Sequence, residues 1–85
     1  GAEVRPAEPW MTLAIVVPEG TVGRVSGDLA RRRAKILGSE SRGTLQVLQA
    51  EAPLAEMIHY ATALRSLTGG RGSFTMRPAR FRITT

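Results

Sequence analysis

The sequence contains no cysteine, one histidine and few aromatic residues, and each shortage excludes a class of protein. Without cysteine, disulfides cannot hold the 85-residue chain together, and one histidine cannot supply the ligands of a structural zinc site. The domain must therefore be held by packing alone. The lack of cysteine also fits a cytoplasmic location, which we expect for this protein.

Long apolar runs are missing as well. The longest extends from Leu13 to Pro18, far short of the ~20 residues that a membrane-spanning helix needs, and it suits a strand. No basic and then apolar stretch of the kind found in secretory signals opens the chain. We therefore expect no membrane partner. Because the chain begins with Gly1-Ala2 rather than methionine, we also expect it to be a piece of a longer protein.

Lysine is nearly absent although the chain is basic. The net charge is +5, and Lys35 is the only lysine among twelve cationic residues. Guanidinium groups bind phosphate with two parallel hydrogen bonds and stack on bases, so an arginine-rich basic domain favours contact with RNA or phosphate. A solvated basic surface without a partner is the alternative interpretation.

Hydrophobic periodicity predicts one domain with four strands and two helices. The strands are expected at residues 10–17, 34–38, 44–50 and 73–76, and the helices at residues 19–33 and 53–67. Their order, β-α-β-β-α-β, predicts an α+β fold of the ferredoxin-like split βαβ type, a four-stranded antiparallel sheet with both helices on one face. We expect residues 1–9 to form a lead-in, residues 10–78 the domain, and residues 79–85 a tail.

The same periodicity predicts which side chains form the core. One face of the first strand carries Met11, Leu13, Ile15 and Val17, and the first helix carries Val22, Val25 and Leu29. The second helix is expected to bury Leu54, Met57, Ala61 and Leu64. Two points stay open. The strand at 44–50 could bury Leu45 and Val47 or Leu48 and Ala50, and Gly23 and Gly27 are either a smooth packing strip or simply tolerated.

Groups that carry catalysis are also missing. His59 has no nucleophile or orienting partner near it in the sequence, so an ordinary surface or boundary position is expected. The run Gly69 to Gly72 follows a helix and lacks the Lys-Ser/Thr of a phosphate-binding loop, which favours a helix end and a turn. The sequence therefore predicts no catalytic residue, no metal site, and no cofactor or small-molecule ligand in this domain.

RNA-recognition motifs share the predicted fold and stack bases on aromatic side chains of the central strands. Here the strand at 44–50 has no aromatic residue, and the strand at 10–17 has only Trp10. RNA contact should therefore come from loops and helix ends, through phosphates.

The basic residues form two predicted patches. The first lies at the end of the first helix and contains Arg31, Arg32, Arg33 and Lys35; the second contains Arg65, Arg71, Arg77, Arg80 and Arg82. Successive helical side chains point about 100° apart, so the three consecutive arginines should not all touch one partner. Charge complementarity with the negative C-terminal end of the helix is the alternative role of the first patch.

Several runs of residues resemble the C-terminal domain of elongation factor G. Gly27-Asp28-Leu29 with Arg31-Arg32-Arg33 is similar to its GDL-x-x-RRG pattern, and Ala52 to Met57 with Tyr60-Ala61-Thr62 to its PLAEM and YAT runs. Leu64 to Thr68 with Gly70-Arg71-Gly72 is similar to its LRS-x-T-x-GRG segment. The matches extend from about residue 8 to residue 76. Departures are Ala34 at the glycine of RRG, Gly20-Thr21 in place of Glu-Tyr, and a less acidic tail after Met76.

The resemblance implies a ribosome-docking domain, without enzymatic activity of its own, from a translational GTPase whose GTP and magnesium are bound elsewhere. The implied partners are large-subunit rRNA and the stalk-base protein at the factor-binding centre, near the sarcin–ricin loop, and the GTPase domain of the parent protein. The residues expected to contact RNA are Arg31, Arg32, Arg33, Lys35, Arg42, Arg65 and Arg71.

Three alternatives stay open at this point. The parent could be a paralogue, including a ribosomal-protection protein of the tetracycline-resistance type. The domain could be a purely intramolecular packing module without RNA contact. It could also be a ferredoxin-like regulatory domain that binds a small molecule, although no motif supports this.

Overall fold

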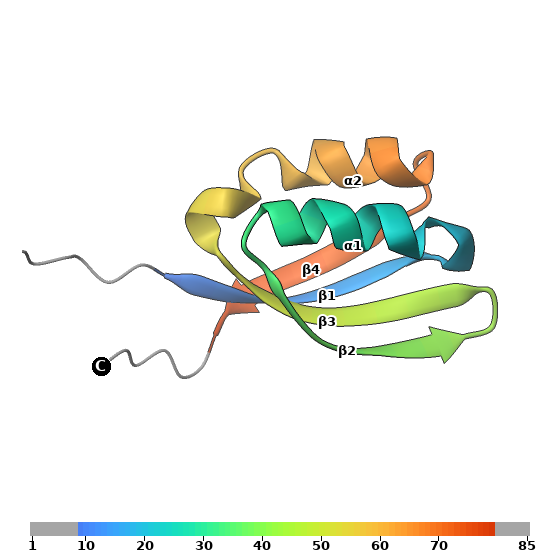
Figure 1. Ribbon diagram of the computed structural model, residues 1–85, viewed down its shortest axis with the longest axis horizontal. Helices are drawn as coiled ribbons and strands as arrows, with labels where there is room; N and C mark the ends of the chain where they lie inside the picture. Colours follow the sequence, from blue (N-terminus) through green and yellow to red (C-terminus); the bar gives the residue numbers. More distant parts are fainter. Residues whose placement is uncertain (1–8, 80–85) are drawn as a thin grey trace, which may run out of the picture.

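The computed structural model describes residues 9–79 and shows helices packed on a sheet in two layers (Figure 1). Along the chain lie β1 (Trp10–Pro18), η1 (Glu19–Thr21), α1 (Val22–Arg31), β2 (Lys35–Arg42), β3 (Leu45–Pro53), η2 (Leu54–Met57), α2 (Tyr60–Thr68) and β4 (Ser73–Pro78). The predicted α+β ferredoxin-like fold is confirmed. Most of the predicted lead-in at residues 1–9 and tail at residues 79–85 lies outside the described residues.

The four strands form one antiparallel sheet in the order β2-β3-β1-β4. The central strand β1 pairs with β3, with Leu13 opposite Ala50, and with β4, with Leu13 opposite Met76. Both helices cover the same face of this sheet, and no helix of residues 9–79 lies on the other face (Figure 1). The sheet therefore presents one face to the core and one to the outside.

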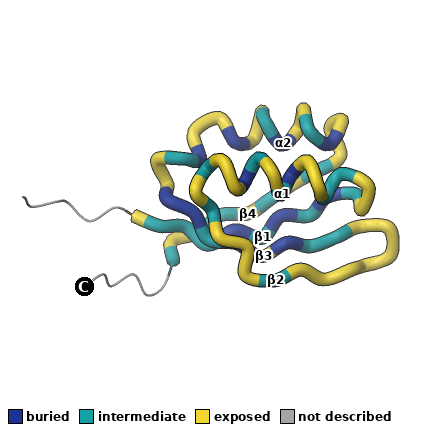
Figure 2. The backbone as a smooth tube through the Cα atoms, in the orientation of Figure 1, coloured by how far each residue is buried: buried dark blue, intermediate teal, exposed yellow. Residues whose placement is uncertain are grey.

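The core lies between the helices and the sheet (Figure 2). Leu13, Ile15 and Val17 of β1 are buried against Val25 and Leu29 of α1, as the alternation of the sequence predicted. On β3, the inward residues are Leu48 and Ala50, whereas the side chain of Leu45 is exposed. The structure thus decides the point that the sequence left open on this strand.

The first helix is shorter than predicted. Instead of one helix over residues 19–33, the turn η1 precedes α1, which ends at Arg31. Arg33 adopts a left-handed conformation with φ 66°, and the amide of Ala34 donates back to the carbonyl oxygen of Leu29 at 3.0 Å. This reversed hydrogen bond is the Schellman arrangement that terminates helices. It directs the chain straight into β2, which extends to Arg42 and leaves only a short turn before β3.

The second helix begins later than predicted. Residues 54–57 form η2, and α2 starts only at Tyr60 after a turn in which His59 takes φ 63°. A left-handed residue interrupts a right-handed helix. The buried face consequently shifts to Met57, Tyr60, Leu64 and Thr68, while Leu54 and Ala61, which were predicted to be in the core, are exposed.

Candidate nucleic-acid interface

The residues predicted to contact RNA lie at two opposite ends of the sheet. Arg31, Arg32, Arg33 and Lys35 occupy the end where α1 runs into β2. Arg42 lies beside the β2–β3 turn, and Arg71 lies in the connection between α2 and β4. Those two connections meet the far end of β1: Glu19 donates to Thr44, and Gly72 approaches Val17. A strand as long as β1 spans roughly 26 Å, so the candidates cannot form one small site.

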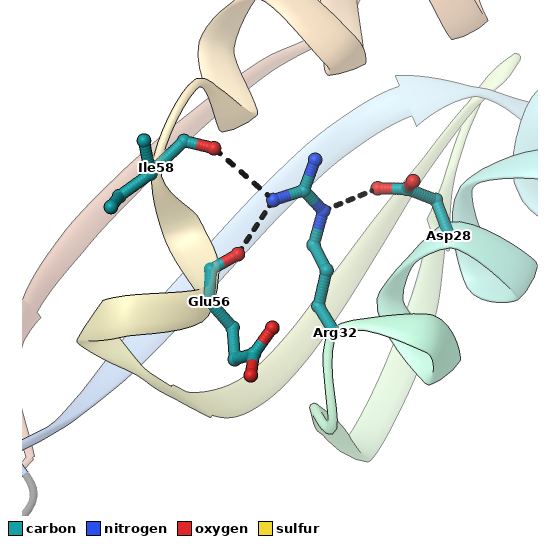
Figure 3. A network of polar contacts seen from close by, with 4 residues as sticks. All are labelled: Asp28, Arg32, Glu56 and Ile58. Carbon is teal, nitrogen blue, oxygen red and sulfur yellow. Dashed lines mark hydrogen bonds and ion pairs between the residues drawn. The ribbon is translucent and has the colours of Figure 1, made fainter.

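Arg32 is engaged inside the domain (Figure 3). Its Nε donates to Oδ2 of Asp28 at 2.8 Å, and its Nη1 donates to the carbonyl oxygens of Glu56 at 2.6 Å and Ile58 at 3.4 Å. The guanidinium carbon also lies 5.0 Å from the centre of the Tyr60 ring, a cation–π distance. The side chain is only 18% exposed. Arg32 therefore joins the end of α1 to the segment before α2, and RNA contact at this position stays a prediction.

The turn at Ile58 and His59 makes this anchor possible. In an uninterrupted helix, the carbonyl oxygens of Glu56 and Ile58 would accept hydrogen bonds from amides four residues further on. Because the chain turns there, both oxygens can accept from Arg32 instead. The sequence offered one signal for this arrangement, the spacing of Asp28 and Arg32 four residues apart on one helix.

The neighbours of Arg32 present their charge outward. Arg31 and Lys35 are exposed, and the Arg33 side chain is 55% exposed, with its Nε 3.3 Å from Oε2 of Glu56. Exposed ion pairs of this kind contribute about 0–1 kcal/mol, so a phosphate can compete with the Glu56 carboxylate for the Arg33 guanidinium. This end of the sheet can therefore bind a polyanion.

The opposite end is basic but less dense. The Arg42 side chain is 63% exposed and its Nε lies 3.7 Å from Oε2 of Glu40, while Arg65 and Arg71 are also exposed. Arg24, on the exposed face of α1, is a further outward cation that the sequence reasoning did not select. Its position before the arginine run was the only signal for it.

A buried threonine fixes the backbone on either side of Arg71. The hydroxyl of Thr68 donates to the carbonyl oxygen of Leu64 at 2.8 Å and accepts from the amide of Gly72 at 2.8 Å. Gly72 has no room for a side chain, because a Cβ there would lie 3.0 Å from two atoms of Thr68 and 3.2 Å from Val17. The Thr and the final Gly of the LRS-x-T-x-GRG run thus set the loop that carries Arg71.

Tyr60 lies beneath the Arg32 anchor. Its ring meets Phe74 edge-on, with the ring centres 5.0 Å apart, and its hydroxyl has no hydrogen-bond partner among the described residues. Burial, and secondarily the negative charge of Asp28, raise the pKa of Tyr60 to about 12, although Arg32 acts in the opposite direction. At neutral pH Tyr60 is therefore an uncharged packing residue.

Residues 9–79 hold no cluster of three or more His, Cys, Asp or Glu residues that could bind a metal ion. Across the same residues, no helix is long and apolar enough to cross a membrane. His59, which the sequence placed at a surface or boundary position, is exposed. The described surface offers a polyanionic partner guanidinium groups at the ends of helices and strands.

Comparison with known proteins shows which family this chain resembles. A sequence model of the family described as Elongation factor G C-terminus matches residues 5–85. Curated proteins named Elongation factor G from Chlamydia caviae and Chlamydia trachomatis serovar D are 54% and 53% identical over 74 residues. These alignments cover 87% of this chain and 11% of each relative, so the chain spans about a ninth of the relatives' length.

A solved structure supports the same relationship. A crystal structure of a protein from Thermus thermophilus superposes with a TM-score of 0.81 at 45% sequence identity. The superposition covers 86% of this chain and 11% of the Thermus chain. The likeness thus includes the arrangement of helices and strands as well as the sequence motifs.

Proposed function

The chain belongs to the Elongation factor G C-terminus family, and we propose that it is the domain with which a translational GTPase docks on the ribosome. The domain is not catalytic. Its partners are the rRNA and stalk-base protein at the factor-binding centre of the large subunit, and the GTPase domain against which it packs. That other domain binds GTP and magnesium, and the parent protein acts in the cytoplasm.

The observation that carries the proposal is the outward presentation of arginine at the helix ends. Arg31 and Arg33 at the end of α1 and Lys35 at the start of β2 are exposed, and the internal anchor of Arg32 holds the backbone between α1 and β2. Preorganised cations lose less conformational freedom on binding than mobile ones, which favours phosphate contact. Family membership supports rRNA as the polyanion.

Sedimentation with isolated large ribosomal subunits tests the proposal directly. The chain should cosediment at low salt, and the association constant should fall steeply as salt is raised, because each phosphate contact releases counterions. Failure to cosediment at low salt and high chain concentration contradicts the proposal. A salt-independent association would also contradict it, since contacts with rRNA phosphates require this dependence.

The purely intramolecular alternative predicts a different result. If the arginines were incidental, replacing Arg31 and Arg33 by alanine would leave ribosome affinity unchanged. Under the proposed function the same double variant loses affinity while its fold, monitored by circular dichroism, stays intact, because both side chains are exposed.

A further inference from the structure

The face of the sheet opposite the helices has a middle without charge. Alternate residues of β1 point to it, and the half-buried side chains Thr12, Ala14 and Val16 form its central line. The register places Gln49 and Val47 beside this line on β3, and Ser73 and Thr75 beside it on β4. No acidic or basic residue stands among them.

Charges on this face lie at its Thr12 end and along its β2 edge. Glu51 on β3 and Arg77 on β4 lie on either side of Thr12, and the outer strand β2 carries Lys35, Glu40 and Arg42 on this face. By contrast, the helix layer and its ends expose Arg24, Arg31, Arg33 and Arg65. Both layers therefore carry described cations, but on the open face the charges surround an uncharged middle.

This distribution does not suit RNA. Surfaces that bind nucleic acid carry cations for phosphates or aromatic residues for base stacking, and the middle of this face has neither. A middle depleted of charge and surrounded by charged residues is instead the anatomy of a protein–protein interface. Leu45, 38% exposed on the same face near the β2–β3 turn, adds apolar surface.

A hollow marks one end of the face. It has a volume of about 500 Å³ and is lined by Thr12, Arg77, Pro78 and Ala79. The lining offers a hydroxyl and a guanidinium group, which together fit a carboxylate from a partner. At this same end the amide of Ala79 donates to the carbonyl oxygen of Trp10 at 3.0 Å, so the first and last described segments run side by side.

The size of the face selects the kind of protein partner. Four strands of this length present on the order of 400 Å², about half of what each partner buries in a stable interface between free proteins. A partner in the same polypeptide acts at an effective concentration of about millimolar, so a smaller contact suffices. The relatives of this chain are about eight times as long, and their additional polypeptide supplies such a partner.

We propose that the open face of the sheet is the surface on which this domain packs against the rest of its parent polypeptide. The partner surface is uncharged where it covers the middle of the open face, and it carries an acidic side chain opposite Arg77. This inference rests on the proposed function, in which the chain is one domain of a longer GTPase, and it leaves the helix layer free for the ribosome.

The test is a titration followed by NMR in the absence of ribosomes. The isotope-labelled 85-residue chain is mixed with the parent polypeptide that lacks this domain, up to about millimolar concentration. Chemical shifts should change at Ala14, Val16, Val47 and Thr75. No shift at this concentration contradicts the inference, because a tethered contact acts at concentrations of that order. Shifts confined to α1 and α2 contradict it equally.

Two matched lysine substitutions, each at an alanine position, sharpen the test. Ala14→Lys places a charge in the middle of the open face, whereas Ala61→Lys places the same charge on the exposed surface of α2. The first should weaken association with the parent polypeptide by at least about tenfold, and the second by less than about twofold. Thr75→Lys also places a charge in the middle of the open face, at an exposed position of β4 where lysine should not disturb the fold, and it should weaken association in the same way.

Two further results separate this inference from the proposed function. If the chain alone forms dimers that Ala14→Lys disrupts, the face belongs to a second copy and the inference is wrong. Ribosome sedimentation of Ala14→Lys should match that of the unchanged chain. Absence of ribosome binding by the unchanged chain, with its packing on the parent polypeptide intact, would refute the proposed docking function alone.

Discussion

At Tyr60 a buried hydroxyl has no hydrogen-bond partner among the described residues, yet the ring fills the core beside Phe74. A buried polar group without a partner costs folding free energy, typically about 1–3 kcal/mol from protein mutational data. The packing of the ring and the cation–π contact with Arg32 offset this cost. Tyr60 therefore stabilises the domain through the packing of its ring and not through its hydroxyl.

The free energy of unfolding should fall at alkaline pH, where the buried hydroxyl of Tyr60 ionises. Its pKa is raised to about 12 in the folded protein and lies near 10 in the unfolded chain, so the folded state favours the protonated form. The stabilisation is complete below about pH 10 and is lost as the pH rises towards 12, by roughly 2–3 kcal/mol in total. Denaturant unfolding at several pH values measures this loss, and tyrosinate absorbance reports it because the chain has one tyrosine.

Tyr60→Phe is the control for this prediction. The variant keeps the ring but has no group that ionises, so its stability should not fall through the Tyr60 titration in this range. At neutral pH it should be at least as stable as the unchanged chain, because no hydrogen bond is lost. A marked loss of stability at neutral pH would show that the hydroxyl has a partner.

His59 adopts a left-handed conformation, and its side chain makes no capping hydrogen bond to α2. Residues other than glycine, asparagine and aspartate pay about 1–2 kcal/mol in this region. His59→Gly should therefore raise the free energy of unfolding by up to about 1 kcal/mol, since glycine's greater freedom in the unfolded chain offsets part of the gain. His59→Val should lower it, because a β-branched residue fits this conformation poorly. Thermal unfolding of the two variants tests whether the left-handed conformation of His59 costs folding free energy. A His59→Val variant more stable than the unchanged chain would show that it does not.

At the scale of single elements, the connection between α2 and β4 depends on the contact between Thr68 and Gly72. A methyl group on Gly72 would come within 3.0 Å of Thr68 and 3.2 Å of Val17. Gly72→Ala should therefore destabilise the domain by about 1–3 kcal/mol through overpacking and a weakened hydrogen bond to Thr68.

Gly27→Ala supplies the matched control, measured by the same denaturant unfolding. No described atom lies within 4 Å of a Cβ built at Gly27, and alanine favours the helix by up to about 1 kcal/mol. The variant should be stabilised. The open space at Gly23 and Gly27 also shows that these glycines are tolerated rather than forming a packing strip. Equal effects of Gly72→Ala and Gly27→Ala would rule out crowding as the reason for Gly72.

The elements differ in how far the sequence could predict them. The period-two alternation of β1 predicted its buried face directly, because the pleat alone decides it. The start of α2 could not be predicted in this way, since the turn at His59 accompanies hydrogen bonds from Arg32, a residue 24 positions before Glu56. Residues 53–67 looked helical because their local pattern does not contain that distant contact.

The same limit applies to the candidate site. The sequence identified the basic residues, but their separation into two ends follows from the sheet and its connections, which bring Arg42 and Arg71 to the far end of β1. The internal use of Arg32 depends on the backbone oxygens of η2 and Ile58, which no sequence motif reveals. Residue type was thus predictable, whereas the direction of each side chain required the tertiary structure.

At the scale of the whole molecule, the two layers differ in where their charges lie. The helix layer and its ends present Arg24, Arg31, Arg33 and Arg65, while the open face of the sheet has an uncharged middle. A domain that must contact both the ribosome and its own polypeptide needs two chemically different faces. Phosphate contact should therefore depend on where a cation lies and not on net charge alone.

Two single substitutions that remove the same charge should separate position from net charge. Arg31→Ala removes an exposed cation at the end of α1, and Arg77→Ala removes one from the edge of the open face. In ribosome sedimentation over a range of salt, Arg31→Ala should reduce the slope of log K against log salt by about 0.7–0.9, the loss of one phosphate contact. Arg77→Ala should leave the slope unchanged. Equal slopes in the two variants would mean that the ribosome senses only the net charge, and the assignment of the helix end as the RNA-binding surface would be wrong.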